Sequence, residues 1–176
     1  MPKPAVVLPP LSRVALQRGV DSMVNLIRVT LGPKARAVAI ANTTSNDRAP
    51  EILDDGATIA RRVVELPDPM ENMGAQLVRQ IAWKTREEVG DGATTAAVIA
   101  QTVLAQANRY AASGGNVMRM KAGIEKGIEV ALAELERQSS KLDDPDDMAR
   151  LIAGVTSDPE LGEMFGEIFD IIGAEG

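Results

Sequence analysis

The sequence contains neither cysteine nor histidine in its 176 residues. Without thiols the chain has no disulfide and no cysteine nucleophile, and without imidazole it has no Ser-His-Asp arrangement. The usual zinc sites are excluded as well, because they are built from these two side chains. Any metal must therefore be a hard cation held by oxygen atoms, and any acid–base step must use carboxylates, lysine or water.

Aromatic residues make up only 2% of the chain, and Trp83 and Tyr110 are the only ones with a polar tip. Proteins that bind single-stranded nucleic acid stack bases on aromatic side chains, and binding to a duplex needs clustered lysine and arginine. The net charge of this chain is -6, which is opposite in sign to the charge that would attract a nucleic acid. We therefore expect no nucleic-acid partner.

Long apolar runs are also missing. The longest uncharged stretch, 92–108, contains glutamines and threonines and falls short of the ~20 apolar residues of a membrane span. No secretory signal is expected, because four prolines interrupt residues 1–10, which predict an extended or disordered arm. These features predict a cytoplasmic protein with no membrane partner.

Hydrophobic residues account for 45% of the chain, and nearly all of them are aliphatic. A core rich in alanine suits closely packed helices better than a sheet. Helical spacing and end signals predict helices at 12–31, 57–64, 71–89, about 96–113, 116–137, from Pro145 onward, and 161–172. Residues 36–41 and 51–53 predict one hairpin. We expect a mainly α, multihelical fold with one small β-hairpin, in one or at most two compact units.

Periodicity also predicts which side chains are buried. In the helix 12–31 the apolar stripe comprises Val14, Val20, Met23, Val24, Ile27 and Leu31. In 71–89 the inward residues are Met73, Leu77, Ile81 and Trp83, and those facing solvent are Arg79, Lys84, Arg86, Glu87 and Glu88. In 116–137 the buried row is Met120, Ile124, Ile128, Ala131 and Leu135. Ser12, Asn116 and Ser157 are the expected N-caps, the last with Glu160 in a capping box.

The stretch 89–97 contains two glycines around Asp91, followed by Thr94 and Thr95 at the start of a predicted helix. Free amides and the positive end of the helix dipole favour a phosphate at such a position. Asp91 would repel a phosphate directly, but it could hold a magnesium ion that bridges to phosphate oxygens. The alternative is that Asp91 simply caps the helix while the threonines bond nearby backbone.

Two further glycine-containing turns, which we call corners together with the loop at 90–92, lie beside predicted helix ends. Thr30-Leu31-Gly32-Pro33-Lys34 ends a helix and brings a positive charge, although it also fits a plain C-terminal stop. Asp54-Asp55-Gly56 has paired carboxylates that suit a metal or a water, although it also fits an ordinary turn. Together the three corners could converge on one polyanionic ligand and its cation.

The motifs occur in a characteristic order along the chain. They are Arg18-Gly19-Val20, Val29-Thr30-Leu31-Gly32-Pro33-Lys34, Asp55-Gly56, Glu71-Asn72-Met73-Gly74-Ala75-Gln76 and Gly90-Asp91-Gly92-Ala93-Thr94-Thr95. In this combination the chain resembles the N-terminal part of group I chaperonins, the GroEL type, from about Leu11 to Gly176. The resemblance implies an equatorial-type chaperonin domain, which binds ATP with magnesium and potassium and makes ring contacts with other chaperonin subunits.

The resemblance also implies roles for single residues. Thr30, Leu31, Gly32 and Pro33 would wrap the nucleotide phosphates. Asp91 would hold magnesium, and Gly92, Ala93, Thr94 and Thr95 would form the phosphate loop at the helix N-terminus. Asp54 would contribute its backbone carbonyl, and Asp55 would be the catalytic residue that orients the attacking water.

This sequence departs from the family pattern in several places. Asp54 stands where the family usually has lysine, so a negative charge lies near the phosphates, and Ala93 replaces a usual threonine. The arm 1–10 replaces a segment that normally pairs as a strand with a neighbouring subunit, and its prolines lack the necessary donors.

By resemblance, 1–10 is a proline-rich arm, 11–138 the N-terminal half of the equatorial ATP-binding domain, and 139–176 the start of the intermediate domain. The apical domain, through which unfolded client proteins and the co-chaperonin bind, and the C-terminal equatorial half are expected to be absent. We therefore expect part of an ATP-dependent folding machine, weak or inactive alone as an ATPase. The alternative is a naturally truncated, non-ATPase chaperonin-like interaction protein.

Overall fold

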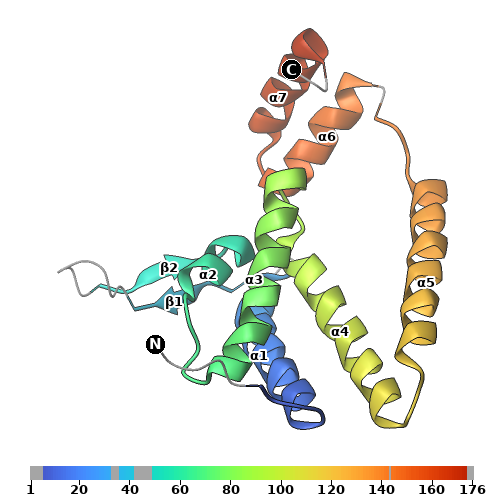
Figure 1. Cartoon of the computed structure of the whole chain (residues 1–176). Coiled ribbons are helices and arrows are strands. Elements are labelled where there is room, and N and C mark those ends of the chain that lie inside the picture. The colour runs from blue at the N-terminus through green and yellow to red at the C-terminus, as the bar shows by residue number, and fades with distance from the viewer. Residues whose placement is uncertain (1–5, 33–35, 42–48, 143, 174–176) are drawn as a thin grey trace. The chain divides into compact units, whose positions relative to one another are not determined.

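The computed structural model describes residues 6–32, 36–41, 49–142 and 144–173, which are mostly helical (Figure 1). The elements are α1 (Leu11–Ile27), the 3₁₀ helix η1 (Arg28–Thr30), β1 (Val38–Ile40), β2 (Glu51–Leu53), α2 (Gly56–Arg62), α3 (Pro69–Val89), α4 (Ala93–Ala112), α5 (Val117–Gln138), α6 (Pro145–Thr156) and α7 (Pro159–Ile172). The two strands pair antiparallel, with Val38 opposite Leu53. The predicted mainly α, multihelical fold with one small hairpin is confirmed.

The chain forms two units, the first up to Lys121 and the second from Ala122 onward. In the first unit α1 packs against α3 and α4, and α2 packs against α3. The core between them consists of Val20, Met23, Val24, Ile27, Ala57, Ile59, Ala60, Ala75, Val78, Ala82, Ala93 and Ala97. Six of these twelve side chains are alanine, which lets the helix axes approach closely.

The contact between α1 and α3 depends on two glycines. A Cβ built on Gly19 would lie 1.7 Å from the carbonyl oxygen of Glu71, and one on Gly74 would lie 2.1 Å from the carbonyl oxygen of Leu16. Each glycine therefore receives the backbone of the opposite helix. Arg18 closes the same crossing with an ion pair of 2.8 Å from its Nε to Glu71 Oε1.

This close crossing corrects the predicted inner face of α3. Met73 and Leu77 are 55% and 49% exposed, whereas the buried residues are Gly74, Ala75, Val78 and Ala82. The inner face is set by the small residues that let α1 approach, not by the largest apolar ones. In α1 the stripe is confirmed at its centre, but Val14 at one end and Leu31 beyond the other are about half exposed.

Two predicted caps are wrong. Ser12 lies inside α1, whose N-cap is Pro10 with no side-chain cap bond. Ser157 adopts a left-handed conformation at the end of α6, and Asp158 caps α7 by accepting from the N–H groups of Glu160 and Leu161. The cap at Asn116 is confirmed, because its Oδ1 accepts from Met118 N at 2.9 Å and Arg119 N at 3.0 Å.

In the second unit α6 and α7 form an antiparallel hairpin with a short connection (Figure 1). Gly162 and Gly166 of α7 face Ala149 of α6, so this pair also packs through small residues. The predicted buried row of α5 is wrong, because none of its side chains is buried. None of the described helices combines the length and apolar character needed to cross a bilayer.

Candidate functional site

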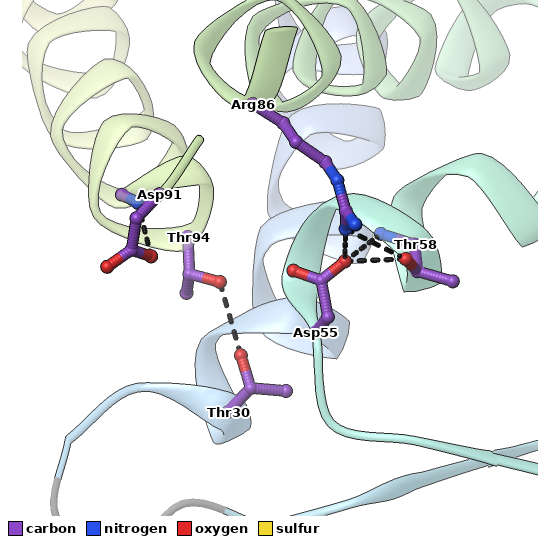
Figure 2. A network of polar contacts seen from close by, with 7 residues as sticks. Thr30, Asp55, Thr58, Arg86, Asp91 and Thr94 are labelled. Carbon is purple, nitrogen blue, oxygen red and sulfur yellow. Dashed lines mark hydrogen bonds and ion pairs between the residues drawn. The ribbon is translucent and has the colours of Figure 1, made fainter. Parts of the chain in front are cut away.

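Three corners of the first unit meet at a cavity of about 140 Å³. Its walls come from the end of η1, the turn before α2, and the loop between α3 and α4 (Figure 2). The lining residues are Thr30, Leu31, Asp54, Asp55, Gly56, Asp91, Gly92, Ala93, Thr94 and Thr95. Nearly all the predicted site residues are therefore brought together. Gly32 is not part of the lining, and Pro33 lies outside the described residues.

The N-terminus of α4 opens into this cavity. Gly92 is the N-cap, with a φ of 82°, which a residue with a side chain adopts rarely. The first described bond within the helix runs from Ala96 N to Gly92 O, at 2.9 Å. The N–H groups of 93–95 thus have no main-chain acceptor among the described residues and remain available to an anion.

Asp91 does not cap this helix. Its Oδ1 accepts from the N–H of the next residue, Gly92, at 2.6 Å, and α4 has no side-chain cap bond. Its second carboxylate oxygen has no partner among the described residues, and the side chain is exposed. The alternative interpretation of Asp91 as a simple cap is therefore wrong, and a carboxylate oxygen beside the cavity is left for a cation.

Two threonine hydroxyls join opposite walls of the cavity. Thr30 Oγ1 donates to the carbonyl oxygen of Ile27 at 2.8 Å and lies 3.1 Å from Thr94 Oγ1 (Figure 2). Because the single proton of Thr30 is already used, Thr94 is the donor between the two hydroxyls. This bond ties the end of η1 to the first turn of α4, and a Cβ on Gly56 would lie 2.0 Å from Thr94 Oγ1.

Asp55 is the N-cap of α2 and lies on the third wall of the cavity. Its Oδ2 accepts from Thr58 N at 2.9 Å and from Thr58 Oγ1 at 2.5 Å, which is an N-cap arrangement. Arg86 reaches across from α3 and places its Nη1 against the same oxygen and 3.1 Å from Thr58 Oγ1 (Figure 2). The ordinary-turn interpretation of this corner accounts for the cap but not for the ion pair with a residue 31 positions away.

A larger groove of about 910 Å³ lies between α1 and α4. Four of its polar side chains already bind one another, because Asp21 Oδ1 accepts from both Gln17 and Gln101, and Gln17 Oε1 accepts from Asn108. No glycine lines it, and the helix N-terminus at its edge is that of α1, which follows two prolines instead of a glycine loop. The smaller cavity is therefore the better candidate site, although it is smaller than the about 300–1,000 Å³ of pockets that enclose a drug-sized ligand.

Residues 23–167 match the model of the TCP-1/cpn60 chaperonin family, which is most of the chain. The chain belongs to this family. Among solved structures, it is similar to the chaperonin gp146 from the bacteriophage EL 2 (Pseudomonas aeruginosa), determined in the presence of ATP-BeFx. The TM-score is 0.70 at 21% identity, over 93% of this chain and 28% of the phage protein. This likeness supports a chaperonin fold, and the chain spans little more than a quarter of the phage protein's length.

The structure gives several motif residues of this chaperonin-family chain a packing role. Gly19 and Gly74 let α1 and α3 cross, and Arg18 pairs with Glu71 at the same crossing. These motif residues do not line the cavity. They fix the crossing of α1 and α3 and so position two of its walls, because α1 leads into η1 and α3 leads into the loop at 90–92.

Sequence reasoning missed two residues that contact Asp55 behind the cavity lining, Thr58 and Arg86. Thr58 lies three residues after Asp55, which is the spacing of a capping interaction and could have been noticed. Arg86 was predicted only as part of a solvated helix face. Nothing local in the sequence links it to Asp55, because the pairing depends on how α3 passes α2.

The Asp55 carboxyl predicts a pH effect on this chaperonin-family chain. Burial by itself raises its pKa, but the hydrogen bonds from Thr58 and the Arg86 guanidinium outweigh burial and lower the pKa below its ordinary value of 3.8. The ionised carboxylate therefore stabilises the fold above pH 3.8, and this contribution is lost as the pH falls through the lower folded-state value. Thermal unfolding followed from neutral pH to below 3.8 should show this loss.

Asp55→Asn is the matched variant for this test, because its side-chain oxygen can still accept from Thr58 N. We expect it to be less stable than the wild type at neutral pH by about 1 kcal/mol or less. The difference should shrink as the pH falls below 3.8 and vanish once it has passed the lower folded-state pKa, where the wild-type carboxyl is protonated in both states. Parallel stability profiles of the two proteins across the whole range would contradict this role of the carboxylate.

Proposed function

We propose that this chain forms the phosphate-binding and magnesium-binding side of a nucleotide site in a chaperonin that folds other proteins by binding and hydrolysing ATP. The observation that carries the proposal is the convergence of three glycine corners on one cavity at the N-terminus of α4. Family membership supports the chaperonin part of it. The phage chaperonin of similar fold was determined in the presence of ATP-BeFx, which is consistent with the nucleotide part.

The available donors fit a polyphosphate. The N–H groups of 93–95 are free of main-chain partners in the described structure, and the helix dipole adds partial positive charge at the same end. Thr30 and Leu31 stand on the opposite wall, so phosphate oxygens would lie between η1 and α4. A cavity of about 140 Å³ has room for the phosphate end of a nucleotide, not for the whole molecule.

The donor set also fits magnesium. No group of three or more acidic side chains that could hold a metal occurs among the described residues. Magnesium commonly uses one or two carboxylates, with water and substrate phosphates completing its shell. Asp91, with one carboxylate oxygen unused, fits this mode. When bound, the ion would supply charge neutralisation at the phosphates.

For hydrolysis we propose positioning without covalent catalysis. The carboxylate of Asp55 lines the cavity and is held ionised by Thr58 and Arg86, so it is able to accept a hydrogen bond from a water molecule. Such a water would be oriented toward the outermost phosphate, which is the general strategy in phosphoryl transfer. The main-chain carbonyl of Asp54 would contribute at the edge of the site.

The finer assignments belong to the same proposal. They are membership of the group I type, residues 11–138 as equatorial and 139–176 as intermediate domain, potassium as a second cation, and a cytoplasmic location. The proposed partners are other subunits of a homo-oligomeric ring. Client proteins and a co-chaperonin would bind through an apical domain outside this sequence.

Isothermal titration calorimetry tests the nucleotide site directly. We expect Mg-ATP and magnesium tripolyphosphate to bind in the millimolar range, and ATP in excess EDTA to bind much more weakly, because the lining is acidic and needs the cation. Tripolyphosphate separates the phosphate side from adenine contacts. If neither magnesium complex binds, the nucleotide proposal fails, and the chaperonin-like interaction protein without ATPase activity becomes the better explanation.

A further inference from the structure

The cavity carries an excess of negative charge for a site that would accept a polyphosphate. Asp54, Asp55 and Asp91 line it, and the described lining includes no lysine or arginine. Like charges at short range disfavour binding, and one magnesium ion does not neutralise both three carboxylates and a triphosphate. Besides the proposed potassium ion, a positively charged side chain close to the lining would offset this excess, and Lys34 lies outside the described residues.

Among the described residues, Arg86 is the cation in contact with a lining carboxylate. The two arginines of α2, the helix that begins after Asp55, have other partners. Arg62 binds Glu51 through two hydrogen bonds, of 2.7 and 2.8 Å, and Arg61 lies over the ring of Trp83 at 4.7 Å from its centre. Of these three arginines of α2 and α3, Arg86 is the candidate, because it contacts a carboxylate of the lining.

Arg86 is attached close to the phosphate loop. It lies in the last turn of α3, and its carbonyl oxygen accepts from Gly90 N at 2.9 Å, where the chain turns into the loop that carries Asp91. Its contacts to Asp55 and Thr58 both use Nη1. Nε and Nη2 have no partner in the described part of the chain, so a planar pair of donors remains for an oxyanion.

We propose that Arg86 is the phosphate-binding cation of this site, and that it exchanges Asp55 for the outer phosphate when the magnesium polyphosphate binds. The inference rests on the proposed nucleotide function and adds a residue to it. Before binding, Arg86 neutralises Asp55. After binding, it neutralises the phosphate and leaves the Asp55 carboxylate free to bind the water. Arg86 thereby supplies a positive charge that is lost where Asp54 replaces the lysine usual in the family.

The exchange is physically easy. The side chains of Arg86 and Asp55 are 45% and 44% exposed, and exposed ion pairs contribute little to stability. Asp55 keeps its two bonds from Thr58 when Arg86 leaves, so the start of α2 stays capped. A phosphate oxyanion offers the guanidinium two acceptors instead of one.

The test measures binding of magnesium tripolyphosphate and magnesium pyrophosphate by calorimetry to the full chain and three variants. Arg86→Gln should weaken tripolyphosphate binding roughly tenfold and pyrophosphate binding less, because the outer phosphate is the one lost. Arg86→Lys keeps the positive charge but loses the planar pair of donors, so its affinity should lie between those of the wild type and Arg86→Gln. Lys84→Gln is the matched control, since it removes one charge from the same helix, where Lys84 pairs only with Glu88 in the described structure, at 3.6 Å. It should bind within about twofold of the wild type.

A second measurement separates phosphate binding from a purely structural role. Asp55→Asn should strengthen tripolyphosphate binding more when Arg86 is present than in the Arg86→Gln background, because only the wild-type arginine is released by the change. If the wild type binds and Arg86→Gln binds equally well, Arg86 has no phosphate role and the nucleotide proposal still stands. If the wild type binds neither magnesium polyphosphate, both proposals fail together. Far-UV circular dichroism verifies that each variant is folded.

Discussion

Gly19→Ala is expected to destabilise the first unit by about 3 kcal/mol or more, the largest effect of any single methyl group that the structure predicts. The new Cβ would lie 1.7 Å from the carbonyl oxygen of Glu71, which is main chain and has no rotamer to change. Either α1 moves away from α3, with loss of the core contacts around Val20 and Val78, or the backbone of α3 distorts. Urea unfolding followed by the fluorescence of Trp83, the only tryptophan, measures the change.

Gly123→Ala in α5 provides the control for this prediction. No atom lies within 4 Å of the position that the added methyl group would take, and alanine has the higher helix propensity by about 1 kcal/mol. We expect the Trp83 midpoint to remain unchanged and the helical circular dichroism signal to persist to slightly higher urea. A Gly19→Ala protein with the wild-type midpoint would show that α1 and α3 do not cross as described.

The second large effect is expected at Asp91. Asp91→Asn should abolish detectable Mg-ATP binding, a loss on the order of 100-fold, because an amide is a poor replacement for a carboxylate ligand of magnesium. The amide oxygen can still accept the N–H of Gly92, so the loop geometry has no reason to change. In excess EDTA the variant should bind ATP no worse than the wild type, which calorimetry with and without the metal can measure.

Asp54→Asn is the informative comparison, since it is the same chemical change in the same cavity lining. Its proposed contribution is the main-chain carbonyl, which the substitution retains. Removal of its charge should therefore strengthen Mg-ATP binding, opposite in sign to Asp91→Asn. If both substitutions changed the affinity in the same direction, Asp91 would have no special role as a metal ligand.

The sequence predicted which residues gather at the cavity better than it predicted which helix faces are buried. Glycines at corners are informative because few other residues adopt such backbone conformations, and the φ of 82° at Gly92 agrees with this. The inner face of α3 was predicted from the largest apolar residues, Met73 and Leu77, but close helix crossing selects the smallest ones. Periodicity identifies a face and cannot say which partner covers it, and for the same reason the buried row of α5 was wrong.

The cap errors have a related cause. Ser157 and Asp158 both carry side-chain oxygens, and the capping-box spacing favoured the serine. Proline at 159 decides the matter, because it occupies the first position of α7 and makes the residue before it the N-cap. Arg86 is the opposite case, since no local pattern contained its partner. A contact between residues 31 apart requires the packed fold.

The two units also differ in how far apart in the chain their contacting helices lie. α6 and α7 follow one another with a two-residue connection, so their contacts close only a short loop. α1, in contrast, packs on α3, which begins after the hairpin and α2 have been made. During synthesis the stripe of Met23, Val24 and Ile27 therefore emerges from the ribosome well before the helix that covers it. For that interval the nascent chain exposes the very kind of apolar surface that molecular chaperones bind.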